Sequence, residues 1–443
     1  MRSDEREALA QRILGFAGDA QAEVLVSDED MGLTRFTHNA IHQNLASLDT
    51  SVRVRTIADG RTGVAATNDL SDAALRATVG RALEIAALAP RDDAFPGLGK
   101  NSQVPAPARA FIPATAEASP ALRAQIAAGI IASAERSALW AAGYATTGRS
   151  GLTIANSSGT LVSFDGTTCA LNVKQNGADS TGFAEQVAND VAELNGRLSG
   201  EFAAQKALTS AAPVAVDPGP WTVILEPAAF GELLSYLTDH FSAQSFDEGS
   251  SFLSDGLERS YAGENVTIAD DFAHPLHAGM PFDFEGYPTR QLPLLAAGVA
   301  RNVVTDSTWA KRLGRENTGH GLPAPSASGP EPRYLVMSGG PKSVEQLIEE
   351  TPRGLLVTRF WYIRPVDQRR TIVTGMTRDG TFLIENGKIA GGVRNMRFNQ
   401  SILEALRHAE FADRQYRSAG YSYSIVVPAV KIEGFRFTSS TAF

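Results

Sequence analysis

The chain has 443 residues, of which 20% are charged and 43% hydrophobic, and its formal net charge is −9. This length is too great for one compact core, so two domains are expected; the acidic balance, with no clustered Lys/Arg stripe, excludes a nucleic-acid-binding surface. The single cysteine, Cys169, excludes internal disulfides and cysteine-rich zinc modules.

In the first half, helical periodicity alternates with strand-like alternation of apolar and polar residues. Residues 51–69 are typical of a hairpin that turns at Asp59-Gly60, and Ser71 is a candidate N-cap for the helix that follows. Helices are expected at 1–17, 71–89, 119–138 and 183–208, and further strands at 22–30, 33–39, 139–148, 151–159 and 160–175.

The helical pattern stops at residues 210–220, where prolines break the chain. Beyond it we expect one amphipathic helix at 230–243 and strands at 221–227, 265–271, 299–307, 354–363, 369–377, 380–389 and 424–440. We therefore predict an N-terminal α/β domain, 1–209, and a strand-rich C-terminal domain, 220–443. Since both halves mix helices with mostly antiparallel strands, the fold class is α+β.

The amino-terminal residues form a polar amphipathic pattern without the apolar region of a signal peptide. No apolar run reaches the roughly 18 residues that a membrane span needs. We therefore expect a cytoplasmic protein without a membrane partner.

Histidines are the first candidates for metal chemistry. In 230–243, His240 lies at the margin of an apolar stripe. This position favours packing over metal binding, because no second His or Glu lies at a ligand spacing in that helix except Glu232, two turns back. His274 and His277 flank Pro275, and a loop is favoured over a chelating helical turn. His320 lies in a Gly/Pro-rich loop of about twenty residues. A loop of this length is often functional or mobile, and the alternative is a simple surface excursion.

Paired carboxylates are the second candidate. In a strand, Asp283 and Glu285 would share one face, where like charges raise one pKa and permit acid–base work. Alternatively, they mark a solvated strand end with Arg290 as counter-ion, and we prefer this second interpretation. No G-x-S-x-G elbow is present, and Cys169 has no local histidine, so nucleophilic catalysis is not indicated.

Several blocks resemble the TldD/PmbA family, whose members are labelled modulators of DNA gyrase and classed among metallopeptidases. They occur in the family's order over residues 220–443, whereas the first half fits the family's more variable domain in outline. The blocks are PFDFEG (281–286) with Thr289, ENTGHG (316–321), TPRGLLVTRFW (351–361), FLIENGKI (382–389) and VVPAVKIEGFRF (426–437).

The resemblance implies that a metalloprotease motif has been lost. Catalytic members carry His-Glu-x-x-x-His on a helix; here Ser235 and Tyr236 stand at the first His and the Glu, and only the second His is retained, as His240. The late Cys that is the third ligand in catalytic members has no counterpart in AGYSYSIVVP (419–428). We expect no catalytic residues, no cofactor and no bound metal.

By this resemblance, the leading hypothesis is a PmbA-like, metal-free subunit that takes part in processing unfolded peptides. It would pair with a TldD-like catalytic subunit, or form a homodimer, and shape the peptide chamber. Two alternatives stay open. One is an active peptidase with a non-standard zinc site around His240, in which His274, His277 and His320 converge and Glu285 or Asp283 is the base. The other is a stand-alone binding protein for peptides or small ligands. The gyrase label gains no support from these residues.

Candidate peptide-binding residues follow from the polar blocks and from the aromatic strand 354–363, to whose edge an extended peptide could add. Arginines near this strand could hold peptide carboxylates, or they could be surface charges. The candidates are Asp283, Glu285, Arg290, His320, Arg359 and Trp361.

Overall fold

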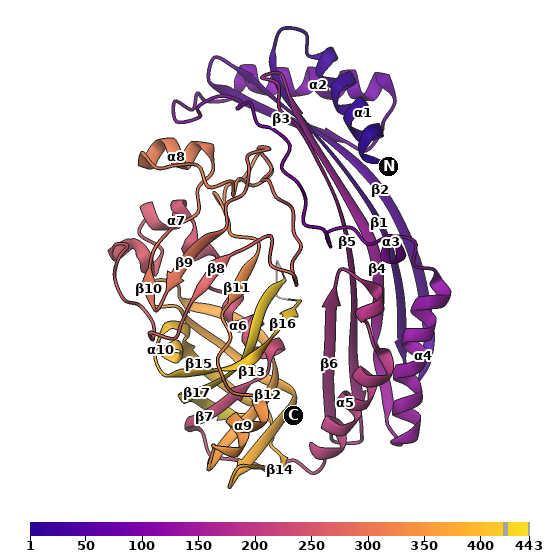
Figure 1. Ribbon diagram of the computed structural model, residues 1–443, viewed down its shortest axis with the longest axis vertical. Coiled ribbons are helices and arrows are strands. Elements are labelled where there is room, and N and C mark those ends of the chain that lie inside the picture. The colour runs from indigo at the N-terminus through magenta and orange to yellow at the C-terminus, as the bar shows by residue number, and fades with distance from the viewer. Residues whose placement is uncertain (420–423, 442–443) are drawn as a thin grey trace.

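The computed structural model describes residues 1–419 and 424–441 and contains two β-sheets that pack together (Figure 1). The first has six strands and comes from the first half of the chain; the second has eleven strands and comes from the second half. Most strand pairs in both sheets are antiparallel, and helices pack against each sheet. The predicted α+β class is confirmed.

The six-stranded sheet has the order β3-β2-β1-β4-β5-β6. Its strands are β1 (Gln21–Thr37), β2 (Ala40–Ala58), β3 (Arg61–Thr67), β4 (Trp140–Asn156), β5 (Leu161–Asn176) and β6 (Thr181–Ala188). β1 and β4 run without a break and pair with each other over most of their length. The sequence predicts each of them as two shorter strands, which is wrong because long antiparallel pairing continues through the polar residues between them.

The Asp59-Gly60 turn is confirmed as a two-residue hairpin between β2 and β3. Ala58 pairs with Arg61, and both turn residues have positive φ, +50° for Asp59 and +73° for Gly60. Such turns need two left-handed residues, which Asp and Gly tolerate better than bulky side chains.

Helices cover one face of this sheet in two groups. They are α1 (Ser3–Phe16), α2 (Asp72–Leu88), α3 (Pro113–Ala116), α4 (Pro120–Arg136) and α5 (Gly196–Thr209), with a 3-10 turn η1 (Val191–Glu193). α1 and α2 share one apolar cluster with β1 and β2, whereas α4 and α5 share another with β4 and β5. The predicted cap is confirmed, since the Ser71 hydroxyl accepts the Ala74 N–H.

The predicted helix at 183–208 is wrong in its first part. Residues Thr181–Ala188 form β6, which pairs with β5 from Asn176 to Cys169, and helix begins only at Gly196. The edge of the six-stranded sheet here overrides the helical preference of Ala and Glu.

The second sheet has the order β10-β9-β8-β11-β17-β15-β13-β12-β7, with β14 beside β13 and β16 beside β17. Its strands are β7 (Gly219–Leu225), β8 (Ile268–Asp270), β9 (Leu292–Ala296), β10 (Val299–Ala300), β11 (Leu335–Met337), β12 (Arg353–Asp367), β13 (Ile372–Glu385), β14 (Lys388–Gly392), β15 (Met396–Ser401), β16 (Ala409–Ser418) and β17 (Ile425–Ser440). Because β7 also pairs with β17, the five strands β7, β12, β13, β15 and β17 form a closed ring.

Short helices fill the connections of this half. They are α6 (Pro227–Ser235), η2 (Thr238–Phe241), α7 (Ala243–Asp247), η3 (Phe252–Asp255), α8 (Ser307–Leu313), α9 (Val344–Glu349) and α10 (Ile402–Leu406). The predicted strand 299–307 is wrong beyond Ala300, because the chain leaves the sheet and enters α8. Residues 210–220, the predicted domain boundary, run from the end of α5 to the start of β7.

The two halves meet at the uncovered face of the six-stranded sheet. Leu152, Ile154 and Val162 of β4 and β5 form an apolar cluster with Met280 and Phe282. The block PFDFEG therefore holds the two halves together. No helix in the described ranges, 1–419 and 424–441, is long and apolar enough to cross a membrane.

Polar contacts join the same halves near β6 and β13. Lys174 of β5 lies 2.8 Å from Asp379, and Lys206 of α5 lies 2.5 Å from Glu226. These side chains are largely buried, so removing either partner would leave a poorly solvated charge.

Candidate functional site

Helix α6 and the turn after it carry the positions at which the resemblance places a metal motif. α6 ends at Ser235, and there the backbone N–H groups begin to bond three residues back: Leu237 to Leu234 at 2.9 Å and His240 to Leu237 at 3.1 Å. The single helix predicted for 230–243 is therefore wrong in its second half, which is a 3-10 turn.

The apolar stripe of this segment forms core, as its spacing indicates. The stripe residues, each at most 1% exposed, are Phe230, Leu233, Leu234, Leu237 and Phe241. They share one cluster with residues of β7, β12 and β17. Gly231 allows a close approach to β16, because a Cβ there would lie 2.8 Å from the Cβ of Ser418.

His240 is a packed histidine. It is 3% exposed, its Nδ1 accepts the Phe252 N–H at 3.4 Å, and the two rings lie 5.2 Å apart. Burial lowers the pKa of His240 to about 4, so the imidazole is neutral near pH 7.

The two residues at the lost motif positions direct their hydroxyl groups to backbone carbonyls. Ser235 Oγ donates to the Glu232 carbonyl at 2.7 Å, within the last turn of α6. Tyr236 OH donates to the Ile363 carbonyl at 2.8 Å and ties the end of α6 to β12. Each hydroxyl is therefore engaged in holding this part of the fold.

These residues do not fit a catalytic zinc ion. Such an ion takes three His, Cys or carboxylate ligands and leaves one position for water. One nitrogen of His240 is used by Phe252, and Ser235 and Tyr236 supply neutral oxygens that already donate hydrogen bonds. Among residues 1–419 and 424–441, no group of three or more His, Cys, Asp or Glu is placed to hold a metal ion.

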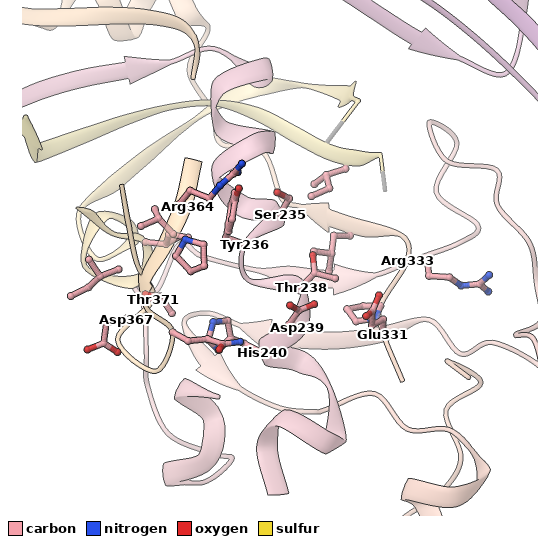
Figure 2. A pocket seen from close by; sticks show the side chains of 18 of the residues that line it. Ser235, Tyr236, Thr238, Asp239, His240, Glu331, Arg333, Arg364, Asp367 and Thr371 are labelled. Atoms are coloured by element: carbon pink, nitrogen blue, oxygen red, sulfur yellow. The ribbon is translucent and has the colours of Figure 1, made fainter. Parts of the chain in front are cut away.

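A cavity of about 560 Å³ opens beside α6 and η2, and Figure 2 shows the side chains around it. One wall comes from residues 235–240, at the end of α6 and in η2. The other walls come from the loop before β11 and from the end of β12 and the turn after it. The labelled lining residues are Ser235, Tyr236, Thr238, Asp239, His240, Glu331, Arg333, Arg364, Asp367 and Thr371. The lining thus offers carboxylates, guanidinium groups and hydroxyls to a polar ligand.

A second cavity, of about 320 Å³, shares Tyr236 and Arg364 with the first. Of the predicted peptide-binding residues, Arg359 and Trp361 line this second cavity. The guanidinium group of Arg359 stacks on Phe183 of the first sheet, 4.6 Å from the ring centre. The two cavities adjoin at Tyr236 and Arg364, and we call the pair the α6 groove.

Asp283 and Glu285 lie elsewhere, in a turn rather than a strand. Asp283 is fully buried and accepts three backbone N–H groups, those of Glu285 (2.9 Å), Tyr287 (2.8 Å) and Gly321 (2.8 Å). Burial and the Glu285 carboxylate raise the pKa of Asp283, whereas the three donors favour its charged form. The prediction of a solvated strand end is wrong, because this carboxylate organises a buried loop.

Glu285 lines a separate cavity of about 280 Å³ between the two halves. Its oxygens accept the N–H and the hydroxyl of Ser307 at 3.0 and 2.7 Å, at the start of α8. The buried ion pair between Glu23 and Arg55 of the first sheet lines the same cavity. Glu285 thus contributes to the contact between the halves.

Arg290 and His320 are also placed by the structure. Arg290 pairs with exposed Glu316 at 2.5 Å and is not the counter-ion of Asp283. His320 is 1% exposed; its Nδ1 lies 2.9 Å from Thr318 Oγ1 and its Nε2 lies 3.2 Å from Asp270 Oδ1. Peptide contact by these residues stays a prediction, and for His320 and Asp283 it would require their loops to open.

His274 and His277 do not form a chelating pair. His277 is buried with its Nε2 3.1 Å from the Leu335 carbonyl, and burial lowers its pKa to about 4. His274 is part-exposed, and its Nδ1 accepts the Leu276 N–H. Cys169 is buried, and burial raises the pKa of its thiol to about 12. The segment at which the family's late Cys is missing includes residues 420–423, which lie outside the described residues.

Sequence reasoning missed Glu232 as a member of the groove. This residue lies on α6 between buried Gly231 and Leu233, and its carboxyl group lines the second cavity. A lone carboxylate in an otherwise apolar helix was the available signal.

Models of the PmbA/TldA metallopeptidase family match two parts of the chain. The model of the C-terminal domain matches residues 218–439, and the model of domain 1 matches residues 22–86. The first match alone covers half of the chain. The protein therefore belongs to the PmbA/TldD metallopeptidase family, and the resemblance found in its sequence is confirmed.

Curated relatives share part of the chain. A metalloprotease from Methanothermobacter thermautotrophicus is 26% identical over 285 residues, which are 59% of this chain and 60% of that protein. The metalloprotease PmbA of Escherichia coli O157:H7 is 27% identical over 208 residues, which are 46% of this chain and 43% of that protein. The chain thus spans less than two thirds of the length of either relative.

Solved structures match over nearly the whole chain. TldE from Thermococcus kodakarensis matches with a TM-score of 0.87 at 23% identity. The match covers 99% of this chain and 100% of the TldE chain. A Thermotoga maritima protein described as a modulator of a DNA gyrase has a TM-score of 0.86 at 20% identity, with 98% and 100% covered. At these identities the likeness establishes the fold.

Proposed function

We propose that this chain is a non-catalytic, metal-free member of the family that binds unfolded peptides and pairs with a TldD-like metalloprotease. In this role it helps to enclose the chamber in which the partner cleaves its substrate. The observation that carries the proposal is the engagement of Ser235 and Tyr236 with backbone carbonyls at the two positions where catalytic members have a ligand and a base.

The chemistry of the residues present supports the non-catalytic half. Zinc hydrolysis needs a carboxylate that takes a proton from metal-bound water. A tyrosine whose hydroxyl donates to the Ile363 carbonyl cannot take this proton at neutral pH. His240 alone, with one nitrogen engaged, makes no site.

The α6 groove supports the peptide-binding half. β12 pairs with β13 along its length, but β7 pairs with it only at Leu355–Val357. In the part of the chain that the structure describes, the other edge of Arg359–Asp367 has no ladder partner, and Trp361 and Tyr362 there are 44% and 62% exposed. An unpaired edge beside a polar groove suits an extended peptide that adds as a strand.

Two measurements test the metal-free assignment and the pairing separately. Elemental analysis of the purified chain should give zinc well below one equivalent, both for the wild type and for His240→Ala. Stoichiometric zinc that is lost in His240→Ala would overturn the metal-free assignment.

Pairing is tested by co-expression with a TldD-like paralogue and gel filtration. We expect both chains in one peak, with a mass that exceeds either chain alone. Two independent peaks at micromolar concentrations of both chains would overturn the partner role.

A further inference from the structure

The second compartment of the α6 groove lies where the two halves of the molecule meet. Tyr144, Phe183 and Glu185 enter it from the six-stranded sheet, and Glu232 and Trp361 enter it from the other half. Its volume of about 320 Å³ can hold one side chain or one chain end, but not a folded segment.

Glu232 is the residue of this compartment whose carboxylate lacks a partner. Its carboxylate is half-buried, and within residues 1–419 and 424–441 it has no hydrogen-bond partner. Burial raises its pKa to about 7, although Arg359 acts in the opposite direction. A carboxylate that is desolvated and unpaired in a cavity is a functional-site candidate, because fold stability alone disfavours it.

Arg359 does not neutralise this carboxylate fully, because it has other contacts. Its Nε lies 3.8 Å from Asp379, and its guanidinium group lies against the rings of Phe183 and Trp361, at 4.6 and 5.4 Å from their centres. The faces of Phe183 and Trp361 are therefore already used by an arginine, which leaves the two carboxylates rather than these two rings to hold a further cation.

Glu185 adds a second, incompletely used carboxylate. One of its oxygens accepts the Ser418 hydroxyl at 3.0 Å and the Ala419 N–H at 3.3 Å, and its other oxygen has no hydrogen bond among the described residues. Glu185 and Glu232 line the same compartment, one from each half of the molecule. Two such acceptors can share a compact cation with several N–H donors.

We propose that Glu232 and Glu185 form a subsite for one primary ammonium group of a bound peptide, from either a lysine side chain or a free amino terminus. This inference rests on the proposed peptide-binding function and adds a substrate class to it. The peptide would follow the β12 edge past Tyr236 and place its ammonium group in the compartment.

The test uses the full-length chain and ten-residue unstructured peptides in calorimetric titrations at pH 7.5. One peptide carries a single internal lysine and a free amino terminus; the others are acetylated at the lysine, at the terminus, or at both. Comparison of the two singly acetylated peptides tells which ammonium group is bound. We expect the doubly acetylated peptide to bind about tenfold or more weakly, because a charge-assisted hydrogen bond is lost.

Variants assign the effect to the compartment. Glu232→Gln and Glu185→Gln should each remove most of the difference between free and doubly acetylated peptides. Glu433→Gln, which removes one exposed carboxylate from β17, should keep that difference; thermal melts confirm that all three variants are folded.

The outcomes separate the two proposals. Equal binding of free and acetylated peptides, or tighter binding of a peptide with aspartate in place of lysine, would overturn the ammonium subsite while peptide binding stands. No binding of any peptide, with the partner interaction intact, would overturn both the subsite and the peptide-binding function.

Discussion

Replacement of Asp283 tests whether this residue organises its loop or binds a peptide. Its two oxygens accept three backbone N–H groups, two partly buried ones on Oδ1 and the buried Gly321 N–H on Oδ2. Each buried donor left without an acceptor costs about 1–3 kcal/mol. After partial relaxation, Asp283→Ala should lower the free energy of unfolding by about 3–5 kcal/mol.

The amide variant refines this prediction. In Asp283→Asn the amide oxygen can keep the two bonds made by Oδ1, whereas the NH2 group faces the Gly321 N–H and cannot accept it. The loss should therefore be about 1–3 kcal/mol, smaller than that of the alanine variant. The exposed Asp413→Ala is the control and should stay within about 0.5 kcal/mol of wild type.

Urea unfolding followed by far-UV circular dichroism measures the free energy of unfolding of each variant. The comparison requires that the slope of this free energy against urea concentration is equal for all variants. A loss below about 1 kcal/mol for Asp283→Ala would refute the assigned structural role. Unchanged stability together with lost peptide affinity would instead support the direct peptide contact that the sequence predicts.

Three further predictions concern α6. The pKa of Glu232 is raised to about 7, mainly by burial, with Glu185 and Arg359 as the charged neighbours; the folded state holds this proton in a range where the unfolded state has lost it. Stability should therefore fall as pH rises from about 4.5 to 7, and Glu232→Gln should remove about 2 kcal/mol of that fall in urea titrations across pH, after allowance for solvent screening. Phe230→Ala leaves a cavity at a fully buried position and should cost about 3–5 kcal/mol in the same assay, and a cost below about 1 would contradict its place in the core. Tyr236→Phe removes the hydrogen bond to the Ile363 carbonyl and should cost about 1 kcal/mol without increasing zinc content, as measured by unfolding and elemental analysis.

Local chemistry predicted several elements well. The Asp59-Gly60 hairpin and the Ser71 cap depend on residues two or three positions apart, and both are present. The apolar stripe around Phe230 and Leu234 also follows from spacing alone, because a buried helical face needs that period.

Features that depend on distant partners could not be found in this way. β6 is a strand because β5 is available beside it, although its own residues favour helix. The sequence shows Asp283 only as one of two nearby carboxylates, because the Gly321 N–H that donates to it lies 38 residues away along the chain. Glu232 lines a cavity together with Glu185 of the six-stranded sheet, and the sequence does not show that these two residues come together.

The pairing of β7 with β17 has a consequence for synthesis on the ribosome. All strands of the six-stranded sheet have been made once Ala188 has been added, whereas the ring in the second half cannot close until β17 has emerged, some 250 residues later. Leu152, Ile154 and Val162 cannot meet the Met280 and Phe282 side chains that will cover them until those residues have been added, part-way through that interval. Up to that point the nascent chain presents an apolar sheet face to solvent or to chaperones.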